Sequence, residues 1–302
     1  GVPLFLEEVT RSVLESDRVR VTSDRVELRG VPPRDVIPAT VQDSLLARLD
    51  RLGPARALAQ LAAVVGHEFD ASTLRDLGLV DDDGLRRGLA ALVEANVVQR
   101  DAAVEGAYAF RHVLFRDAAY QSLPRAARRR QHDAVLRVLL DRDPDLADRR
   151  PELLARHYEG AGLPGEALEF WRAAGASTSA RSAFLEAESN FRRALEQLDA
   201  LPPSPERDRR EVALRTGLGL ALVSTQGFAT RAIEENYARA SELCARATEV
   251  PFAVLIGVWS VVFVRGDRAG VDRMVGQLRR VAETTDDPTV RLVAHQTLAS
   301  RA

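Results

Sequence analysis

The sequence contains no lysine, and all 42 of its basic residues are arginine. The phosphate-binding loop of P-loop nucleotide enzymes needs a lysine that reaches the β- and γ-phosphates. These 302 residues therefore hold no such loop. They also lack a Gly-x-Ser-x-Gly elbow, a His-Glu-x-x-His helix and a Ser-His-Asp order. We expect no catalytic residue and no enzymatic activity in this stretch alone.

Cysteine is nearly absent as well, since Cys244 is the single example. One cysteine excludes an internal disulfide and a cysteine-based zinc site, and it fits a reducing compartment such as the cytoplasm. The most apolar run, Pro251 to Val264, has about 14 residues, which is too short to span a bilayer and predicts a buried helix. A net charge of -2 gives no overall attraction for nucleic acid or anionic membrane.

The N-terminal pattern predicts a helix over 4–16, with Leu4, Phe5 and Val9 on one face. Short alternating runs at 19–21 and 26–28 indicate a small hairpin. Prolines then interrupt regular structure until a helix that Thr40 caps, which runs to Leu52.

The next segment predicts three helices followed by a two-stranded wing and a fourth helix, an order typical of a winged-helix domain. Asp81 is placed to cap the third helix, and Leu85, Leu89 and Leu92 form its core stripe. Acidic residues at the start of that helix would face DNA phosphates unfavourably, so we expect no direct DNA binding. In order, these helices and strands are expected at 54–65, 72–77, 81–95, 97–100, 108–110 and 112–123.

Beyond Leu123 every pattern is helical, and large and small apolar residues recur at the spacing of tetratricopeptide repeats. Small residues at these places let two helices approach closely. One copy uses Trp171, Ala174 and Gly175 with Ala187, Phe191 and Ala194. An overlapping copy uses Leu154, Tyr158, Ala167, Trp171 and Ala174, and a degraded copy uses Leu220, Ala221, Tyr237 and Ala240. The repeats would run from Pro151 to the end of the chain.

His112 is the strongest candidate for a binding residue, because it stands at the start of a predicted helix, where free N–H groups attract anions. It could donate a hydrogen bond to a nucleotide phosphate. The alternative is a histidine that caps its own helix or packs beneath the wing. The other four histidines, His67, His132, His157 and His295, have no partner at metal-ligand spacing, so no metal site is expected.

Charged clusters receive structural interpretations. The one basic cluster, Arg125 with Arg128 to Arg130, could contact nucleic acid or a phosphate, but a solvated face or an interdomain salt-bridge surface is the favoured interpretation. The repeat glutamates Glu186, Glu188, Glu234 and Glu235 are interpreted as solvated faces.

Four strings, Gly1 to Glu8, Ile37 to Leu52, Leu61 to Phe69 and Phe110 to Tyr120, make the chain resemble bacterial signalling ATPases of the STAND class. These AAA-related proteins carry tetratricopeptide repeats and are fused to a class III adenylate/guanylate cyclase or to a LuxR-type regulator. The resemblance covers nearly the whole chain.

The resemblance implies a mainly α fold in which a lid helix and a winged-helix domain precede an α-solenoid. The corresponding domains are residues 1–38 (end of the ATPase lid with the hairpin), 39–123 (winged helix with its leading helix), 124–150 (helical connector) and 151–302 (truncated repeat array). Both ends of the chain are expected to be truncations of a longer protein.

The resemblance also implies a nucleotide site. Gly1 and Pro3 match the Gly-x-Pro motif whose proline lies against adenine, and His112 matches the histidine that reaches the β-phosphate. ATP or ADP, with Mg²⁺ in the parent protein, would bind mainly to an upstream domain that carries the P-loop.

The function implied is that of a regulatory and sensor portion, which couples an inducer or protein partner on the repeats to an ATPase and an effector outside this chain. The parent would be an ATPase, with either a cyclase or a transcriptional regulator attached. The alternative is a protein-interaction scaffold with no nucleotide role.

Overall fold

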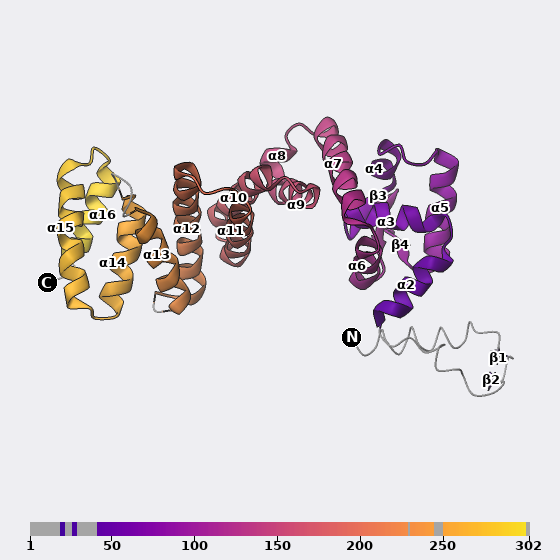
Figure 1. Cartoon of the computed structure of the whole chain (residues 1–302), viewed down its shortest axis with the longest axis horizontal. Coiled ribbons are helices and arrows are strands. Elements are labelled where there is room, and N and C mark those ends of the chain that lie inside the picture. Colours follow the sequence, from indigo (N-terminus) through magenta and orange to yellow (C-terminus); the bar gives the residue numbers. More distant parts are fainter. Residues whose placement is uncertain (1–18, 22–25, 29–40, 229, 245–249, 300–302) are drawn as a thin grey trace. The chain divides into compact units, whose positions relative to one another are not determined.

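A computed structural model describes residues 19–21, 26–28, 41–228, 230–244 and 250–299. Within these ranges the chain is mainly α, with fifteen helices (α2–α16) and five short strands (Figure 1). It divides into two compact units between Pro144 and Asp145. None of the described helices is long and apolar enough to cross a membrane.

The predicted hairpin is present. Strands β1 (Val19–Val21) and β2 (Val26–Leu28) pair antiparallel, with Val19 opposite Leu28. The predicted helix over 4–16 and the cap Thr40 lie outside the described residues. Helix α2 (Val41–Arg51) begins where a helix was expected.

The helices of the first unit surround one hydrophobic core. Leu45 and Leu49 of α2 meet Phe110 and Phe115 in it, and all four side chains are almost fully buried. The third predicted helix is confirmed together with its cap, because Asp81 accepts a hydrogen bond from the Gly84 N–H at 2.7 Å. The remaining helices are α3 (Ala55–Val65), α4 (Ala71–Asp76), α5 (Asp82–Glu94), α6 (Val113–Gln121) and α7 (Arg125–Arg142).

The expected two-stranded wing is part of a three-stranded antiparallel sheet, so that prediction was wrong in strand number. Strands β3 (Glu68–Asp70), β4 (Val98–Arg100) and β5 (Ala107–Phe110) pair in the order β3-β5-β4. The sequence did not predict β3 because three residues are too few to show an alternating apolar pattern. Asp70 ends this strand and also caps α4, where its carboxylate accepts a hydrogen bond from the Thr73 N–H at 2.7 Å.

Helix α7 belongs to the first unit, although the sequence placed it in a connector over 124–150. Val135 of α7 packs with Val64 and Leu123 in a small apolar cluster. At the other end of the helix, Arg142 donates to Asp76 at 2.6 Å and to the Thr73 hydroxyl at 2.8 Å.

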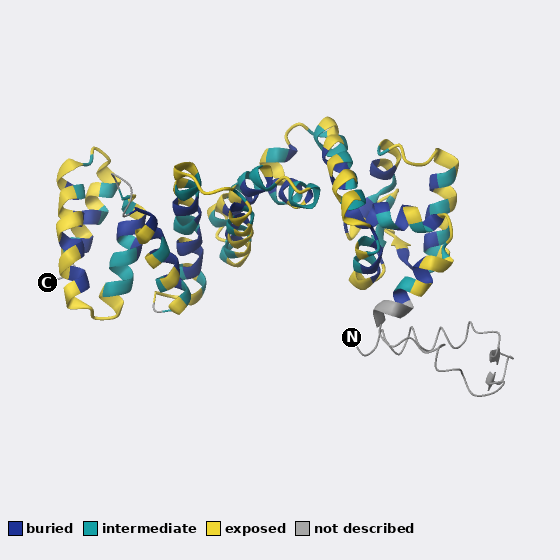
Figure 2. Cartoon of the chain, in the orientation of Figure 1, coloured by how far each residue is buried: buried dark blue, intermediate teal, exposed yellow. Residues whose placement is uncertain are grey.

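The second unit consists of helices that pack on one another in chain order. Contacts also join α10 to α12 and α12 to α14, so alternate helices form one layer. Figure 2 shows the buried residues of these helices turned toward their neighbours. The helices are α8 (Leu146–Arg149), α9 (Pro151–Ala161), α10 (Pro164–Ala180), α11 (Phe184–Asp199), α12 (Pro205–Gln226), α13 (Arg231–Cys244), α14 (Phe252–Val264), α15 (Arg268–Thr284) and α16 (Pro288–Ala299).

Aromatic rings wedged between glycines set the distance between these helices. The Phe191 ring of α11 lies against Gly175 of α10 and Gly217 of α12. Farther along the same array, a Cβ added to Gly257 of α14 would lie less than 3.0 Å from the ring of Tyr237 on α13. Such contacts leave no room for a methyl group, so these glycines fix how closely the backbones approach.

Two expectations for the repeat region were wrong. Leu220, assigned to a buried repeat position, is 54% exposed, whereas the neighbouring Gly219 and Ala221 are buried. The apolar run after Pro251 does form a helix, α14, but most of it is only half-buried, and Phe263 and Val264 are exposed.

Adding a methyl group should therefore have opposite effects at two helical glycines. We expect Gly257→Ala to destabilise the second unit by about 1–3 kcal/mol, because the methyl overlaps the Tyr237 ring. Gly276→Ala on α15, where nothing lies within 4 Å of the added Cβ, should stabilise it by about 0.5–1 kcal/mol. Both tryptophans of the chain, Trp171 and Trp259, lie in this unit, so urea unfolding followed by tryptophan fluorescence measures it selectively. If the two substitutions changed the unfolding free energy equally, the close contact between Gly257 and the Tyr237 ring would be contradicted.

Candidate functional site

The candidate nucleotide residues do not all fall within the described structure. Gly1 and Pro3 lie outside the described residues. Of the three candidate residues, His112 alone lies within the described structure.

His112 occupies the N-cap position of α6, directly after β5, in an extended backbone conformation. Its imidazole makes no capping hydrogen bond with the helix, and the residue is exposed. Neither structural alternative, a capping histidine or one packed beneath the wing, describes it.

The surroundings of His112 are open and partly apolar. Val113 and Leu114, the first two residues of α6, are both exposed. The guanidinium of Arg111, the residue before His112, donates to the Asn96 side-chain oxygen at 2.8 Å. The first turn of α6 contains no acidic residue, so its N–H groups and the imidazole can both donate to an anion that approaches this end.

The other four histidines are either buried in the hydrophobic interior or exposed on the surface. His132 is buried and shares a hydrogen bond with the Tyr120 hydroxyl at 2.9 Å, and His157 is fully buried. His67 and His295 are exposed. In the part of the chain that the structure describes, no group of three His, Cys, Asp or Glu residues is arranged to hold a metal ion.

The basic cluster lies in the first turns of α7. Arg125, Arg129 and Arg130 are exposed, and the Arg128 guanidinium lies 5.2 Å from the centre of the Tyr120 ring. This arrangement matches a solvated basic face that leans on one aromatic residue. Helix α7 itself contains no Phe, Tyr or Trp on which a nucleic-acid base could stack.

Two of the repeat glutamates are not solvated faces, contrary to expectation. Glu188 is largely buried, pairs with Arg192 at 2.9 Å and accepts from the Thr225 hydroxyl at 3.2 Å, which links α11 to α12. Glu234 pairs with Arg265, which links α13 to α14. These carboxylates join neighbouring helices.

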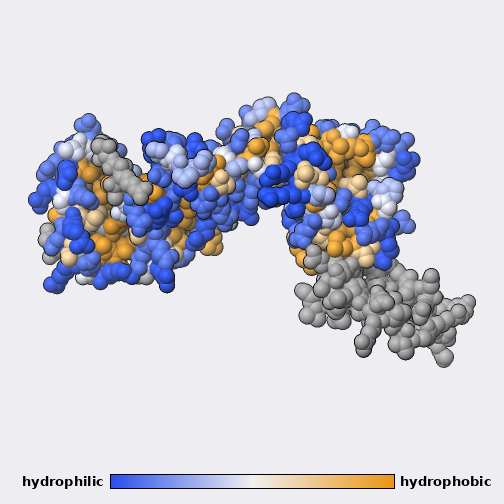
Figure 3. Space-filling model, in the orientation of Figure 1, coloured by the Kyte–Doolittle hydropathy of each residue, from blue (hydrophilic) through white to orange (hydrophobic). Residues whose placement is uncertain are grey.

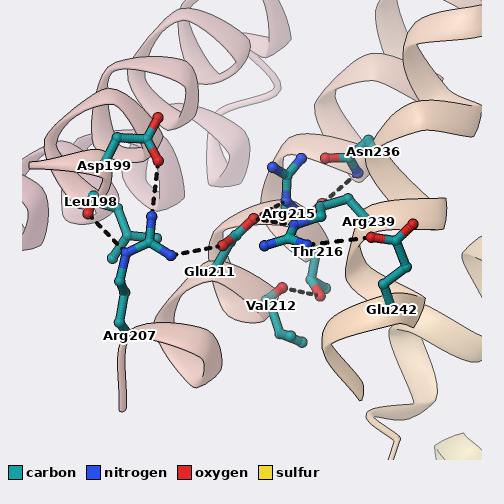
Figure 4. A network of polar contacts seen from close by, with 10 residues as sticks. All are labelled: Leu198, Asp199, Arg207, Glu211, Val212, Arg215, Thr216, Asn236, Arg239 and Glu242. Atoms are coloured by element: carbon teal, nitrogen blue, oxygen red, sulfur yellow. Dashed lines mark hydrogen bonds and ion pairs between the residues drawn. The ribbon is translucent and has the colours of Figure 1, made fainter. Parts of the chain in front are cut away.

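Glu211 on α12, the most buried carboxylate among the described residues of the second unit, was not singled out from the sequence. Figure 4 shows it among three guanidinium groups, with Arg215 at 2.9 Å, Arg239 of α13 at 3.0 Å and Arg207 at 3.4 Å. Arg207 also pairs with Asp199 of α11 at 2.9 Å. The buried Glu211 carboxylate on α12 is thus linked to α13 through Arg239 and to α11 through Arg207.

The electrostatics of Glu211 follow from two opposing causes. Burial raises the pKa of its carboxyl, while hydrogen bonds and positive charge from Arg239 and Arg215 lower it, and the net pKa lies below the usual value. The carboxylate therefore stays ionised and contributes stability. With every partner an arginine of the same unit, the network is a structural support and offers no acid or base for catalysis.

The position of Glu211 could have been found from its spacing. It precedes Leu214 by three residues and Leu218 by seven, so it lies on the apolar stripe of α12, and both leucines are buried. A charged residue on such a stripe predicts a buried ion pair. The sequence does not reveal that Arg239 of the next helix completes it.

Comparison with known proteins assigns no family. No protein-family description matches the chain, and no solved structure matches it. The chain is similar to a curated protein of Rhizobium meliloti (strain 1021) named "Uncharacterized protein R02095", at 31% identity over 254 residues, which is 82% of this chain. It spans 24%, about a quarter, of that relative's length.

Neutralising Glu211 should weaken the second unit at neutral pH. We expect Glu211→Gln to lower its unfolding free energy by about 1–3 kcal/mol, because three guanidinium groups lose their carboxylate. Glu206→Gln on the same helix, whose pairs with Arg209 and Arg210 are exposed, is the matched control and should leave the unfolding free energy nearly unchanged. Tryptophan-monitored urea unfolding of both variants measures the difference.

The pH dependence provides the second readout. Because the native pKa of Glu211 is below its unfolded value, its contribution is present above about pH 4.3 and is lost as the pH falls through the native pKa. The stability gap between the native protein and Glu211→Gln should therefore narrow in acid. A gap that stays constant from neutral pH down to about pH 3 would contradict this assignment.

Proposed function

We propose that this chain is the regulatory and sensor portion of a nucleotide-switched signalling ATPase of the STAND class. In this proposal the first unit holds one side of a nucleotide site, and the helical array of the second unit binds an inducer or protein partner. The P-loop domain and the effector, either a cyclase or a transcriptional regulator, belong to parts of the longer cytoplasmic protein outside this chain. The observation that carries the proposal is the exposed His112 at the uncapped start of α6.

The element order of the first unit supports a winged-helix domain. Helices α3, α4 and α5 precede the β4–β5 hairpin, and α6 follows it. The third strand, β3, pairs on the far side of β5, as a short strand between the first two helices can do. Helix α2 would be the leading helix that joins this domain to the lid.

The packing of the second unit supports a tetratricopeptide-like solenoid. Helices contact their successors in chain order, and α10, α12 and α14 form a layer of alternate helices. The large-small positions Trp171, Ala174, Ala187 and Phe191 are buried at the helix contacts. A layered array of this kind presents a broad surface to a partner.

The chemistry of the first unit suits a diphosphate group. An imidazole at a helix start can donate to a phosphate oxygen while the first N–H groups of α6 support the same anion. Val113 and Leu114, exposed beside it, would be covered by the nucleotide-binding domain. Mg²⁺, which accompanies ATP, would be held by that domain rather than by residues of this chain.

A bound nucleotide would favour the closed arrangement only as far as it binds that state more tightly than the open one. An inducer on the repeats would act in the opposite direction, with a coupling of about 1–3 kcal/mol if typical of allosteric proteins. Direct DNA binding by this chain is not part of the proposal, because α5 begins with the acidic Asp82 and Asp83.

The length of the relative is consistent with a multidomain parent. Its remaining three quarters leave room for a nucleotide-binding domain and an effector domain, although its printed name assigns neither.

The proposal predicts that His112→Ala weakens ADP binding at least roughly tenfold, because a charge-assisted hydrogen bond to phosphate is lost. Calorimetry should use the protein extended by the upstream P-loop domain that the proposal places before Gly1. Pro3→Ala should weaken binding too, through lost contact with adenine. His295→Ala, which removes an exposed histidine of the repeat array, is the matched control and should leave the affinity unchanged.

The alternative function is a protein-interaction scaffold without a nucleotide role. Absence of ADP binding, or an affinity that neither Pro3→Ala nor His112→Ala alters, would reject the switch and favour the scaffold.

A further inference from the structure

The turn between α5 and β4 contains an asparagine in the left-handed region. Asn96 follows the end of α5 and has a φ of 52°. The N–H groups of Asn96 and Val97 donate to carbonyl oxygens of the last turn of α5 at 2.9 and 3.0 Å, which are the two bonds of a Schellman motif. Two other helices of the chain end in the same motif, with Gly162 and Gly266 at this position. Glycine adopts this conformation without strain, so the backbone alone does not need an asparagine here.

The asparagine side chain adds a link from this turn to the end of β5. Its oxygen accepts a hydrogen bond from the Arg111 guanidinium at 2.8 Å. The backbone N–H of Arg111 donates to the Val97 carbonyl oxygen at 3.0 Å. Arg111 is therefore attached twice to the α5–β4 turn, once through the backbone and once through Asn96.

His112, the next residue, lies between two fixed points of the chain. Before it, Phe110 is buried and Arg111 is held to the turn. After it, Phe115 is buried in the same core, and its N–H donates to the His112 carbonyl oxygen at 3.0 Å. Because the His112 imidazole makes no capping hydrogen bond, its place is determined by the backbone between these two points.

Apolar side chains limit the number of donors near His112. Val113 and Leu114, which follow it, are exposed. Figure 3 shows apolar patches between hydrophilic ones on the visible face of the first unit, instead of one continuous hydrophilic surface. An anion at the start of α6 would therefore depend on the imidazole and on the first N–H groups of the helix, and so on where the backbone places them.

The acceptor that holds Arg111 is neutral. Arg111 is exposed and makes no ion pair with the described residues, so its positive charge is not cancelled by a carboxylate. The amide of Asn96 thus fixes the guanidinium and leaves its charge in place one residue before His112. This charge favours an anionic ligand over a neutral one.

We propose that Asn96 is a positioning residue for the anion site at the start of α6, and that it acts on His112 through Arg111. The inference rests on the proposed function, in which this site binds the diphosphate group of ADP. A hydrogen bond to a phosphate oxygen weakens when its donor is displaced, so residues that hold the donor contribute to affinity without touching the ligand. Loss of the Asn96 side chain leaves Arg111 with one attachment to the turn and lets the β5–α6 junction move.

Asn96→Gly separates the side chain from the backbone turn, because glycine keeps the left-handed conformation and removes the acceptor. In the protein extended by the upstream P-loop domain, calorimetry should show ADP binding weakened roughly three- to tenfold. The midpoint of thermal unfolding should be equal to or higher than that of the native protein. A purely structural role of Asn96 predicts the reverse, a lower midpoint with native affinity for ADP.

Ser182→Gly is the matched control. Ser182 has a φ of 60° at the end of α10 in the second unit, and its turn makes the same two backbone bonds. Its replacement by glycine should leave the ADP affinity unchanged.

A double variant tests the route through Arg111. Arg111→Ala should weaken ADP binding at least as much as Asn96→Gly, because it removes both the held side chain and its charge. If Asn96 acts through Arg111, the double variant Asn96→Gly/Arg111→Ala should bind ADP no more weakly than Arg111→Ala alone.

The outcomes distinguish this inference from the proposed function. Native affinity in Asn96→Gly, together with weakened binding in His112→Ala, would overturn the positioning role and leave the proposed function standing. Fully additive losses in the double variant would also overturn it, since Asn96 would then act by another route. Native affinity in His112→Ala would reject the proposed function and the positioning role with it.

Discussion

The close approach of helix to helix through an aromatic ring is the constraint on which the second unit depends. Phe191 reaches from α11 to glycines on both α10 and α12, and Tyr237 reaches from α13 to glycines on α12 and α14. Each ring therefore spaces two helices of one layer at once. A single Cβ at these glycines would overlap the ring. The distance between the helices is therefore fixed by glycines in the layer of α10, α12 and α14 and by the size of one aromatic side chain in the layer of α11 and α13. The regular progression of the array follows from repeating this contact.

Part of this arrangement could be predicted from one sequence, and part could not. The spacing of Trp171, Ala174 and Gly175 against Phe191 identifies a close helix pair, because both members lie in neighbouring stretches of chain. The second glycine for each ring lies on the following even-numbered helix, where local spacing gives no sign of it. Leu220 was assigned to the core for this reason: the small residue that Tyr237 requires is Gly219, and the leucine one position later turns to solvent.

The same limit applies to the sheet and to the charges. Asp81 could be predicted as a helix cap because capping depends on residues only three positions apart. The predicted hydrogen bond from the Gly84 N–H to its carboxylate is present. Strand β3 exists because β5 offers it an edge, a condition that three residues cannot express by themselves. Glutamate is usually a surface residue, so the sequence alone does not place Glu188 and Glu211 inside the unit. Their burial is made favourable by ion pairs with arginines, which for Glu211 include Arg239 of the next helix. For the candidate site, the sequence located His112 at a helix start, but its exposure and its lack of a capping bond depend on how β5 leads into α6.

The second unit departs in two ways from the usual pattern of apolar residues inside and charged residues outside. Some of its charged side chains are buried, and some of its large apolar side chains are exposed. The internal charges are accounted for by stability, since Glu211 joins α11, α12 and α13 through arginines. Most of the external apolar residues lie near the turns, away from the glycines inside α10, α12 and α14 that the aromatic rings contact. Phe263 still packs within its own helix, because its ring stacks on Trp259 with the two ring centres 4.6 Å apart. Exposed apolar side chains are common on folded proteins, and here the contacts that set the helix spacing lie elsewhere. The stability of the second unit therefore depends on the interior of its helices more than on its turns.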